Sequence, residues 1–428
     1  MSAIDFRPVS GESRAEPSST TLSHLRVAVV HDWLVVYGGA ERVLEHILDC
    51  FPQADVFSLI DYVPDSQRVF LRGKQPRTSF FQNIPGIARH YRKFLPLMPL
   101  AIEQFNLREY DLVVSSSYCV AKGVLTGPNQ THLCYCHSPM RYAWDHYHDY
   151  LQEHKLERGP ISWFVRWQLH QIRTWDVRSN NMVDHFVANS KFVQARIRKF
   201  YQRDSALVYP PVETDLFSLQ TDKENFYVAA GRLVPYKRLD LVVDAFSVMS
   251  DRQLVLIGDG PEITKLRSKA GPNVKVLGFQ PNDVLKDYLS RARAFIFPSE
   301  EDFGIIPVEA QACGTPVIAF GSGGALETVL PFVEENLGMK ATGVFFNQQT
   351  PESLIAAIEC FEKHETDFNP YFISEHAAKF SPASFKTQLL EQIRWALLNR
   401  SYIPPAPLPP AAPELEASSE YSSPVIHE

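Results

Sequence analysis

Residues 295–318 read FIFPSEEDFGIIPVEAQACGTPVI, and this stretch decides the fold. Two carboxylates in it, Glu301 and Glu309, lie eight residues apart across a Phe303-Gly304 hinge; the first closes an apolar run and the second opens a predicted helix. The junction of a strand end with the next helix start is where an open α/β sheet places its ligand site. A carboxylate there accepts hydrogen bonds from sugar or ribose hydroxyls, and the free backbone N–H groups at a helix start bind anions. The stretch therefore predicts a pocket for a nucleotide sugar.

Length, composition and charge set outer limits on the class of protein. At 428 residues the chain is too long for one ordinary core, so two domains are expected. Apolar residues make up 45% of the chain and its mean hydropathy is −0.17, as in soluble globular proteins. The net charge is −7, but residues 401–428 hold four glutamates and no Lys or Arg, which leaves about −3 for the rest. This balance argues against a nucleic-acid binder.

Cysteine usage and hydropathy predict the compartment. Six scattered cysteines in a chain of this size are typical of free cytosolic thiols rather than of a disulfide framework. No apolar run in the sequence is long enough to span a bilayer, and the N-terminus lacks the apolar core of a signal peptide. We therefore expect a cytoplasmic protein.

Apolar runs and helical patterns alternate along the chain in two series. Alternation of this kind predicts parallel sheets with right-handed crossovers, here joined near residues 209–217. The expected fold is α/β, with two Rossmann-like domains whose parallel sheets face a central cleft. Strands are predicted at 25–30, 54–59, 111–115, 132–136 and 185–188, then at 226–230, 254–257, 274–276, 294–297 and 317–319. Helices are predicted at 40–48, at 191–200 with Asn189-Ser190 as its cap, and at 385–398.

The predicted boundaries divide the chain into five parts. Residues 1–23 are polar and Ser/Glu-rich, and residues 401–428 are Pro-rich and acidic, so both are expected to be disordered tails. The two Rossmann-like domains are expected at 24–212 and 213–382. Residues 383–400 are expected to form a helix that packs back towards the N-terminal domain.

Residues 68–105 combine basic and large apolar side chains. A basic, apolar patch suits an anionic membrane surface. An ordinary helical insertion with a solvated basic face explains the composition equally well, so both interpretations stay open. The residues that carry the pattern are Arg72, Lys74, Arg77, Arg89, Arg92 and Lys93, mixed with Phe80, Phe81, Tyr91, Phe94, Leu95, Leu97, Met98 and Leu100.

Two cations follow the predicted strand at 226–230. Arg232 and Lys237 lie five residues apart on the loop that leaves the sheet. Arg offers a bidentate hydrogen-bonding fork and Lys a point charge, so the pair could clamp a diphosphate. A solvated basic turn is the commoner interpretation of such a pair in isolation. Its place at a strand end, like that of the two glutamates, favours the clamp.

Two glycine turns are weaker signals. Gly258 opens the turn Gly258-Asp259-Gly260, but Ile263 stands at the third glycine position of the dinucleotide fingerprint, which counts against an NAD enzyme. Gly38 and Gly39 precede a predicted helix, where bare amides can approach a phosphate or a sugar oxygen. Glycine pairs are equally common in plain turns between strand and helix, so both interpretations stay open here.

His132, Cys134, Cys136 and His137 have the side chains of a metal site. The first three alternate along one face of a predicted strand, and the sequence has no second ligand cluster, so a buried strand is favoured over zinc. His137 instead begins a polar and aromatic turn, HSPMRYAWD, which could line a cleft. We expect no metal and treat His137 as a candidate cleft residue.

Together these residues resemble the GT-B fold retaining glycosyltransferases of family 4. The resemblance spans roughly residues 25–400, and the segments CHSPMRYAWD and PYKRLD are similar to the mannosyltransferase-like branch of bacterial O-antigen and exopolysaccharide enzymes. Asp302 stands where the family more often has Gly, which adds a carboxylate beside the expected sugar contacts. The motifs that carry the resemblance are the E-x7-E pair Glu301 and Glu309, the G-R-L-x-x-x-K element at 231–237, the phosphate loop Gly38-Gly39 and NSxFV at 189–193.

The resemblance implies roles for individual residues. Arg232 and Lys237 would neutralise the leaving diphosphate in place of a metal ion, and no other cofactor is implied. Glu309 would accept hydrogen bonds from the nucleotide ribose, and Glu301 would hold the hydroxyls of the transferred sugar. His137 would lie beside that sugar and completes the catalytic candidates. The remaining candidate donor contacts are Gly38, Gly39, Gly258, Phe303, Gly304 and Ile305.

The activity implied is that of a retaining, metal-independent hexosyltransferase of polysaccharide biosynthesis. The domain at 213–382 would bind the nucleotide-sugar donor, with GDP-mannose as one candidate, and the domain at 24–212 a saccharide or polyprenyl-diphosphate-linked acceptor. A cytoplasmic enzyme of this kind could lie on the inner face of the membrane. The alternatives are a non-catalytic sugar-nucleotide-binding protein of the same fold, which the complete set of charged residues counts against, and an NAD-dependent oxidoreductase.

Overall fold

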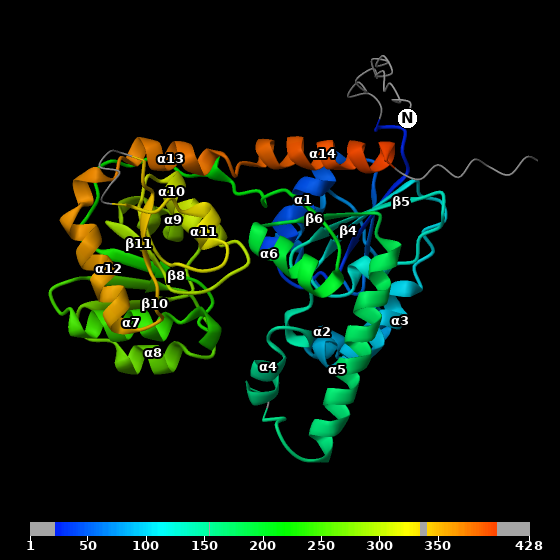
Figure 1. The fold of residues 1–428 in the computed structure, drawn as a ribbon, viewed down its shortest axis with the longest axis horizontal. Coiled ribbons are helices and arrows are strands. Elements are labelled where there is room, and N and C mark those ends of the chain that lie inside the picture. Colours follow the sequence, from blue (N-terminus) through cyan, green and yellow to red (C-terminus); the bar gives the residue numbers. More distant parts are fainter. Residues whose placement is uncertain (1–21, 154, 334–339, 400–428) are drawn as a thin grey trace, which may run out of the picture.

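Two parallel β-sheets lie side by side in the computed structural model, which describes residues 22–153, 155–333 and 340–399 (Figure 1). Within the described residues, all neighbouring strands of both sheets pair in parallel, as the alternation of strands and helices predicts. The expected two-domain α/β fold is confirmed. The predicted disordered tails fall almost entirely outside the described residues.

The N-terminal sheet has seven strands in the order β3-β2-β1-β4-β5-β6-β7. Its strands are β1 (Val27–His31), β2 (Asp55–Ser58), β3 (Arg77–Thr78), β4 (Leu112–Ser117), β5 (Thr131–Cys136), β6 (His185–Ala188) and β7 (Ala206–Leu207). The helices of this domain are α1 (Gly39–Cys50), α2 (Ile87–His90), α3 (Met98–Glu103), α4 (Tyr147–Glu153), α5 (Pro160–Arg178) and α6 (Lys191–Arg196). The last continues as a π-helical turn, η8 (Ile197–Tyr201).

The C-terminal sheet has six strands in the order β10-β9-β8-β11-β12-β13. Its strands are β8 (Tyr227–Ala230), β9 (Leu254–Ile257), β10 (Val274–Gly278), β11 (Ala294–Phe297), β12 (Val317–Phe320) and β13 (Gly343–Phe346). The helices that follow along the chain are α7 (Leu239–Val248), α8 (Ile263–Lys269), α9 (Asn282–Arg291), α10 (Ile305–Ala312), α11 (Ala325–Thr328), α12 (Pro351–Lys363), α13 (Pro370–Ala378) and α14 (Pro382–Leu398).

Both faces of each sheet are buried, because alternate residues of one strand enter different cores. In β1, Val27 and Val29 belong to one buried cluster, while Ala28 and Val30 belong to another on the opposite face. Strands covered on both faces read as continuous apolar runs, which is why periodicity alone could locate β1. All ten predicted strands are confirmed to within two residues at each end.

The strand order reverses once in each sheet, between β1 and β4 and between β8 and β11. In an open α/β sheet the crevice outside the carboxyl ends of the strands at such a reversal is where ligands bind. The loops that leave these four strands start at Asp32, Tyr118, Gly231 and Pro298. The motifs at 231–237 and 301–309 therefore follow the two strands that flank the C-terminal reversal.

The last helix returns to the first domain. α13 packs on α10 in the C-terminal domain, and α14 then contacts α1 and β5 (Figure 1). Its buried face supplies Phe385, Leu389 and Ile393 to the N-terminal core. Ser381 caps the helix by accepting a hydrogen bond from the Ser384 amide, so it begins a turn earlier than predicted.

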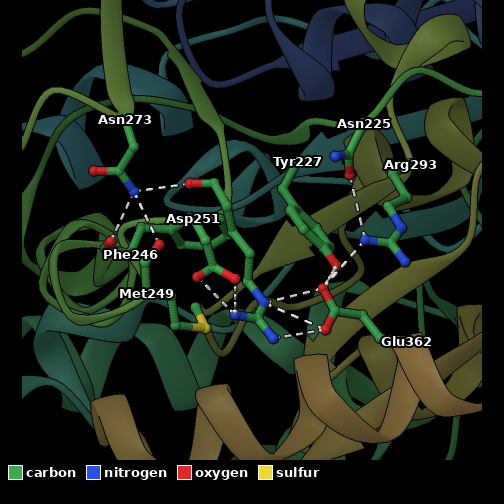
Figure 2. A network of polar contacts seen from close by, with 9 residues as sticks. Asn225, Tyr227, Phe246, Met249, Asp251, Asn273, Arg293 and Glu362 are labelled. Atoms are coloured by element: carbon green, nitrogen blue, oxygen red, sulfur yellow. Dashed lines mark hydrogen bonds and ion pairs between the residues drawn. The ribbon is translucent and has the colours of Figure 1, made fainter.

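A polar network fixes α12 against the C-terminal sheet (Figure 2). The Glu362 carboxylate accepts hydrogen bonds from the Tyr227 hydroxyl at 2.8 Å and from Arg252 and Arg293 at 2.8–3.2 Å. Burial acts to raise the pKa of Glu362, but the hydrogen bonds from Arg252 and Tyr227 outweigh it, so the pKa is lowered. Beside this network, the side-chain amide of Asn273 donates hydrogen bonds to three backbone carbonyl oxygens.

Three strands were missing from the sequence prediction. β3 and β7 are edge strands of only two residues, and β13 is a four-residue strand, Gly343–Phe346, added beside β12. The segment 68–105 forms the edge strand β3 and a run of short helices: η2 (Asp65–Leu71), η3 (Phe80–Asn83), α2, η4 (Tyr91–Leu97) and α3. Pro96 lies inside this run, which limits the length of any helix there.

Candidate active site

A cleft of about 610 Å³ lies between the two domains. Seven of the predicted site residues line it: Gly39, His137, Lys237, Glu301, Phe303, Gly304 and Ile305. They come from both strand reversals, so residues up to 266 positions apart in sequence meet at one place. Gly38, Arg232, Gly258 and Glu309 are not among the residues that line this cleft.

Two helix N-termini, one from each domain, meet at the cleft. α1 begins at Gly39 and α10 at Ile305, and a Cβ on Gly39 would lie 3.1 Å from the Ile305 Cδ1 atom. The first amides of each helix have no carbonyl partner within the helix and carry its partial positive charge. An anionic group in the cleft would therefore be attracted from both sides.

Gly304 makes the sharp entry into α10 possible. Its φ of +88° is a conformation that other residues rarely adopt, and a Cβ there would lie 3.0 Å from the Phe297 ring. The neighbouring Phe303 side chain is buried against Val212 and Phe380. Because Val212 lies where the two domains join, this contact fixes the loop to the segment that connects them. The hinge noted in the sequence is thus a rigid turn that presents the α10 amides.

Lys237 and Glu301 form an ion pair at the wall of the cleft. The Lys237 ammonium donates to Glu301 Oε1, which also accepts a hydrogen bond of 2.8 Å from the Ser299 hydroxyl. Both charged side chains are about four-fifths buried. Arg232, the other predicted cation, is exposed, and no hydrogen bond of its side chain is recorded within the described ranges. It stays a prediction as a diphosphate contact.

His137 sits in a buried chain of polar groups. Its Nε2 lies 2.8 Å from Ser116 Oγ, which is also 3.1 Å from His31 Nδ1. The other nitrogen of His31 lies 3.4 Å from Glu41 in the first turn of α1. Burial, and then the nearby His31, lower the pKa of His137 to about 3. His137 is therefore uncharged at neutral pH and presents a neutral ring to the cleft.

Glu309 borders a separate, smaller hollow of about 160 Å³. Its carboxylate accepts a hydrogen bond of 2.6 Å from Arg42, which lies on α1 in the opposite domain. Asn282 and Lys286 at the start of α9 line the same hollow. α10 therefore borders both spaces, through Ile305 and Ile306 at the cleft and through Glu309 at the smaller hollow.

Asp302, the residue that departs from the family pattern, joins the two domains. Its carboxylate forms an ion pair with Arg196 at the end of α6, and Arg141 lies 3.9 Å away. Arg196 in turn pairs with Asp145 at 2.5 Å and donates to the Ser138 hydroxyl at 3.2 Å. An ion network at the cleft is formed from residues that sequence motifs alone did not connect.

The remaining predicted glycines have local structural explanations. The Gly38 amide donates to the Glu41 carboxylate at 3.0 Å, which caps α1. A Cβ on Gly258 would lie 1.8 Å from the Gly231 carbonyl oxygen, so only Gly allows the two loops to pack together. Their roles as donor contacts stay predictions. This packing also explains the Gly-x-Gly turn without a dinucleotide.

Sequence reasoning missed one buried acid near the cleft. The Asp32 carboxylate, at the end of β1, accepts backbone hydrogen bonds of 2.5–3.0 Å from residues 118–121. These bonds hold the loop after β4, which carries Tyr118 into the cleft wall. A lone Asp directly after a buried strand was the available signal.

The strand that carries His132, Cys134 and Cys136 is buried, as predicted. His132 lies 2.8 Å from both Ser115 Oγ and the Met182 carbonyl oxygen, and both cysteines are packed in a hydrophobic cluster. Within residues 22–153, 155–333 and 340–399, no group of three His, Cys, Asp or Glu side chains could hold a metal ion. These side chains are accounted for by core packing.

Two family models match the chain in succession. The model described as "Glycosyltransferase Family 4" matches residues 37–216, and "Glycosyl transferases group 1" matches residues 212–386. The solved structure of HepE from Anabaena has the same fold, with a TM-score of 0.63 at 18% identity over 87% of this chain and 100% of that one. The chain therefore belongs to the GT-B fold glycosyltransferases of family 4.

Similar curated proteins include mannosyltransferases. The alpha-1,3/1,6-mannosyltransferase ALG2 of Candida glabrata is 25% identical over 51% of this chain and 61% of its own length. ALG2 of Kluyveromyces lactis is 24% identical over 82% and 81%, respectively. A GDP-mannose-dependent phosphatidylinositol monomannoside mannosyltransferase of Corynebacterium glutamicum is 36% identical over 26% of this chain and 33% of its own length. The matches thus span from one third to four fifths of these relatives.

Proposed function

We propose that this chain is a retaining hexosyltransferase that moves mannose from GDP-mannose to a saccharide or lipid-linked saccharide acceptor in polysaccharide biosynthesis, without a metal ion. One observation carries the proposal. Two helix N-termini and the Lys237 ammonium converge on one cleft that Glu301 also lines. Positive charge beside a carboxylate suits a diphosphate attached to a hydroxyl-rich sugar.

Departure of the nucleoside diphosphate is the step that this positive charge would assist. Negative charge grows on the diphosphate as the bond to the sugar breaks, and preorganised positive groups stabilise it in a partly dry site. Lys237 would turn from Glu301 to share the diphosphate, and exposed Arg232 would swing in from the same loop. The α1 and α10 amides would complete the anion site in place of a metal ion.

Glu301 and His137 would hold the transferred sugar. Glu301 is an acceptor for its hydroxyls, and Ser299 keeps the carboxylate oriented at 2.8 Å. His137 is neutral, so it can accept or donate one hydrogen bond without repelling the cationic character that develops on the sugar. The acceptor hydroxyl would attack the face from which the diphosphate leaves, with a diphosphate oxygen as its base. Retention of configuration follows from this geometry.

Glu309 would bind the ribose once Arg42 shares its carboxylate. The hollow beside Glu309 extends to Asn282 and Lys286, polar side chains that suit a nucleoside. The three relatives with mannosyltransferase in their names support mannose as the sugar, and the name of the Corynebacterium protein supports GDP as the carrier. The acceptor is proposed from the position of the cleft between the domains.

The proposed location is the cytoplasm, on the inner face of the membrane. No described helix is long and apolar enough to cross a bilayer. The five arginine and lysine side chains Arg72, Arg77, Arg89, Arg92 and Lys93 are all exposed, but among the described residues only Arg72 and Arg77 of these five pair with acidic side chains. A membrane contact of this segment would therefore rest on its second half.

A donor panel tests the function. Purified protein is incubated with radiolabelled GDP-, UDP-, ADP- and dTDP-sugars, and hydrolysis and transfer products are separated, with and without EDTA. We expect GDP-mannose to be used and to raise the melting temperature, since a ligand at 100 times its Kd stabilises by about 2.7 kcal/mol. EDTA should have no effect. Use of another donor would contradict the GDP-mannose assignment, and an inverted product would contradict the mechanism.

A further inference from the structure

The N-terminal half of α5 has large apolar side chains in contact with solvent. The C-terminal half packs on the domain through Ile172 and Asp176, which are buried. Trp163 is 79% exposed, and Ile161, Phe164 and Trp167 are each more than half exposed. Figure 1 shows α5 extending away from both sheets, with this end beside α4 and farthest from the domain. We call Ile161, Trp163, Phe164 and Trp167 the aromatic tip.

The aromatic tip is a preformed cluster and not a set of scattered side chains. The rings of Phe164 and Trp167 stack with centroids 6.1 Å apart, and Trp163 lies one helical turn before Trp167. A hollow of about 450 Å³ beside them is lined by both tryptophans, Arg158, Arg166 and other polar residues. Contiguous apolar surface of this kind on a water-soluble domain marks an interaction site.

Basic side chains surround the aromatic tip and select its partner. Arg158 and Arg166 line the hollow, where Glu157 is the acidic member. Further along the same domain, η4 packs against the C-terminal half of α5, and its Arg92 and Lys93 are exposed. Trp and Phe rings partition into the headgroup region of a bilayer, while Arg and Lys extend their charges towards anionic lipid. A lipid surface explains both kinds of side chain, whereas an apolar protein partner would leave the cations unexplained.

The other half of α5 reaches the cleft wall. Ile172 and Trp175 near its C-terminal end share a core cluster with Tyr91 of η4, and Tyr91 and Arg92 line the cleft. α5 therefore carries the aromatic tip at one end and packs beside the N-terminal wall of the cleft at the other. A lipid-linked acceptor held at a bilayer under the aromatic tip would approach the cleft along α5 and η4.

We propose that the aromatic tip of α5 inserts into the headgroup region of an anionic bilayer and positions the cleft at the membrane surface. The membrane contact stands on the surface of α5 alone. The delivery of a lipid-linked acceptor rests, in addition, on the proposed function. The second half of the segment 68–105 would then take part through η4, as a neighbour of the principal contact.

Vesicle flotation tests the contact. The full chain is mixed with vesicles of phosphatidylcholine alone or with 30% phosphatidylglycerol and centrifuged through a density gradient. We expect wild type to float with the anionic vesicles, and the triple variant Trp163→Ala, Phe164→Ala, Trp167→Ala to bind at least tenfold less. A matched control replaces Val248, Phe279 and Tyr371 with Ala, since these residues are similarly exposed on the C-terminal domain. The control should float as wild type does.

Two further measurements separate the possible outcomes. Flotation of the triple variant at the wild-type level would overturn the proposal, as would a wild type that fails to float. A change from dimer to monomer in the triple variant, measured by light scattering, would instead identify a second copy of the chain as the occupant and overturn it too. Transfer to a water-soluble acceptor should be unchanged in the triple variant. If wild type itself showed no transfer to the water-soluble acceptor, that result would contradict the proposed function but leave the vesicle result valid.

Discussion

Replacing Asp302 with Asn removes the carboxylate through which the C-terminal domain pairs with Arg196 at the cleft. After this change Arg196 keeps Asp145 at 2.5 Å and the Ser138 hydroxyl at 3.2 Å, so its charge still has partners. The loss is then at most that of one charged hydrogen bond, roughly 1.5–3 kcal/mol, because burial raises the pKa of the Asp302 carboxyl and offsets part of what Arg141 and Arg196 contribute. If that free energy holds the domains closed, the closed population falls roughly tenfold to a hundredfold relative to open forms.

The opposite change is expected to cost more. Arg196→Met leaves both Asp302 and Asp145 partly buried, with only Arg141 at 3.9 Å from Asp302. Breaking a buried pair in this way costs about 3–5 kcal/mol. The two variants differ in their cost in stability because Arg196 keeps two partners when Asp302 is replaced, whereas Asp302 keeps only Arg141 when Arg196 is replaced.

A double-mutant cycle measures the pair directly. Thermal unfolding, donor KM and kcat are determined for Asp302→Asn, Arg196→Met and the double variant, and we expect a coupling of about 1–3 kcal/mol and a raised donor KM. Asp244→Asn is the control, since its pair with Lys269 is exposed at 2.8 Å and should contribute at most about 1 kcal/mol. Strictly additive effects, or an unchanged donor kcat/KM in Asp302→Asn, would refute the reasoning.

Three further predictions concern single groups. Burial lowers the pKa of His137 to about 3, so below about pH 6.5 the unfolded chain binds a proton at His137 that the folded chain does not. The free energy of unfolding should therefore fall by up to about 1.4 kcal/mol per pH unit. His137→Gln should flatten that slope in urea unfolding, and an unchanged slope would contradict the assignment. The pKa of Glu362 is lowered by the hydrogen bonds shown in Figure 2, so the stability it adds is present above its unfolded pKa and lost as pH falls through its folded pKa. The stability gap between wild type and Glu362→Gln should therefore shrink from pH 6 to pH 3, and a constant gap would argue against the network. A Cβ on Gly258 would lie 1.8 Å from the Gly231 carbonyl oxygen, so Gly258→Ala should lower the free energy of unfolding by roughly 3 kcal/mol. The control is Gly127→Ala, whose Cβ would lie 3.5 Å from its nearest atom and which should cost less than about 1 kcal/mol. Equal costs in the two variants would show that the contact between Gly258 and Gly231 relaxes freely.

The sequence was sufficient for the fold because its strands are buried on both faces. Continuous apolar runs such as β1 and β11 stand out without knowledge of their partners. The turn at Phe303-Gly304 was also readable, since Gly permits the φ of +88° that the entry to α10 needs. Short edge strands such as β3 carry no such signal, because neighbouring strands and not their own composition make them strands.

The partners of the charged site residues could not be read from the sequence. Arg42 meets Glu309 across 267 positions, and Arg196 meets Asp302 across 106, in contacts that exist only once the two domains are placed together. Motifs predicted that Lys237 and Glu301 would both line the site, but not that they pair with each other. The aromatic tip of α5 was missed because burial, which sequence composition does not give, is what makes its tryptophans unusual.

The central claim is that Lys237 supports the departing diphosphate, and transfer kinetics of Lys237→Met test it most directly. The substitution keeps an unbranched side chain of similar length, removes the charge, and leaves Glu301 with Ser299 at 2.8 Å. With the donor that the panel identifies, we predict a fall in kcat of roughly 100-fold to 1,000-fold, at unchanged circular dichroism. Transfer by Lys237→Met at the wild-type rate would contradict the account.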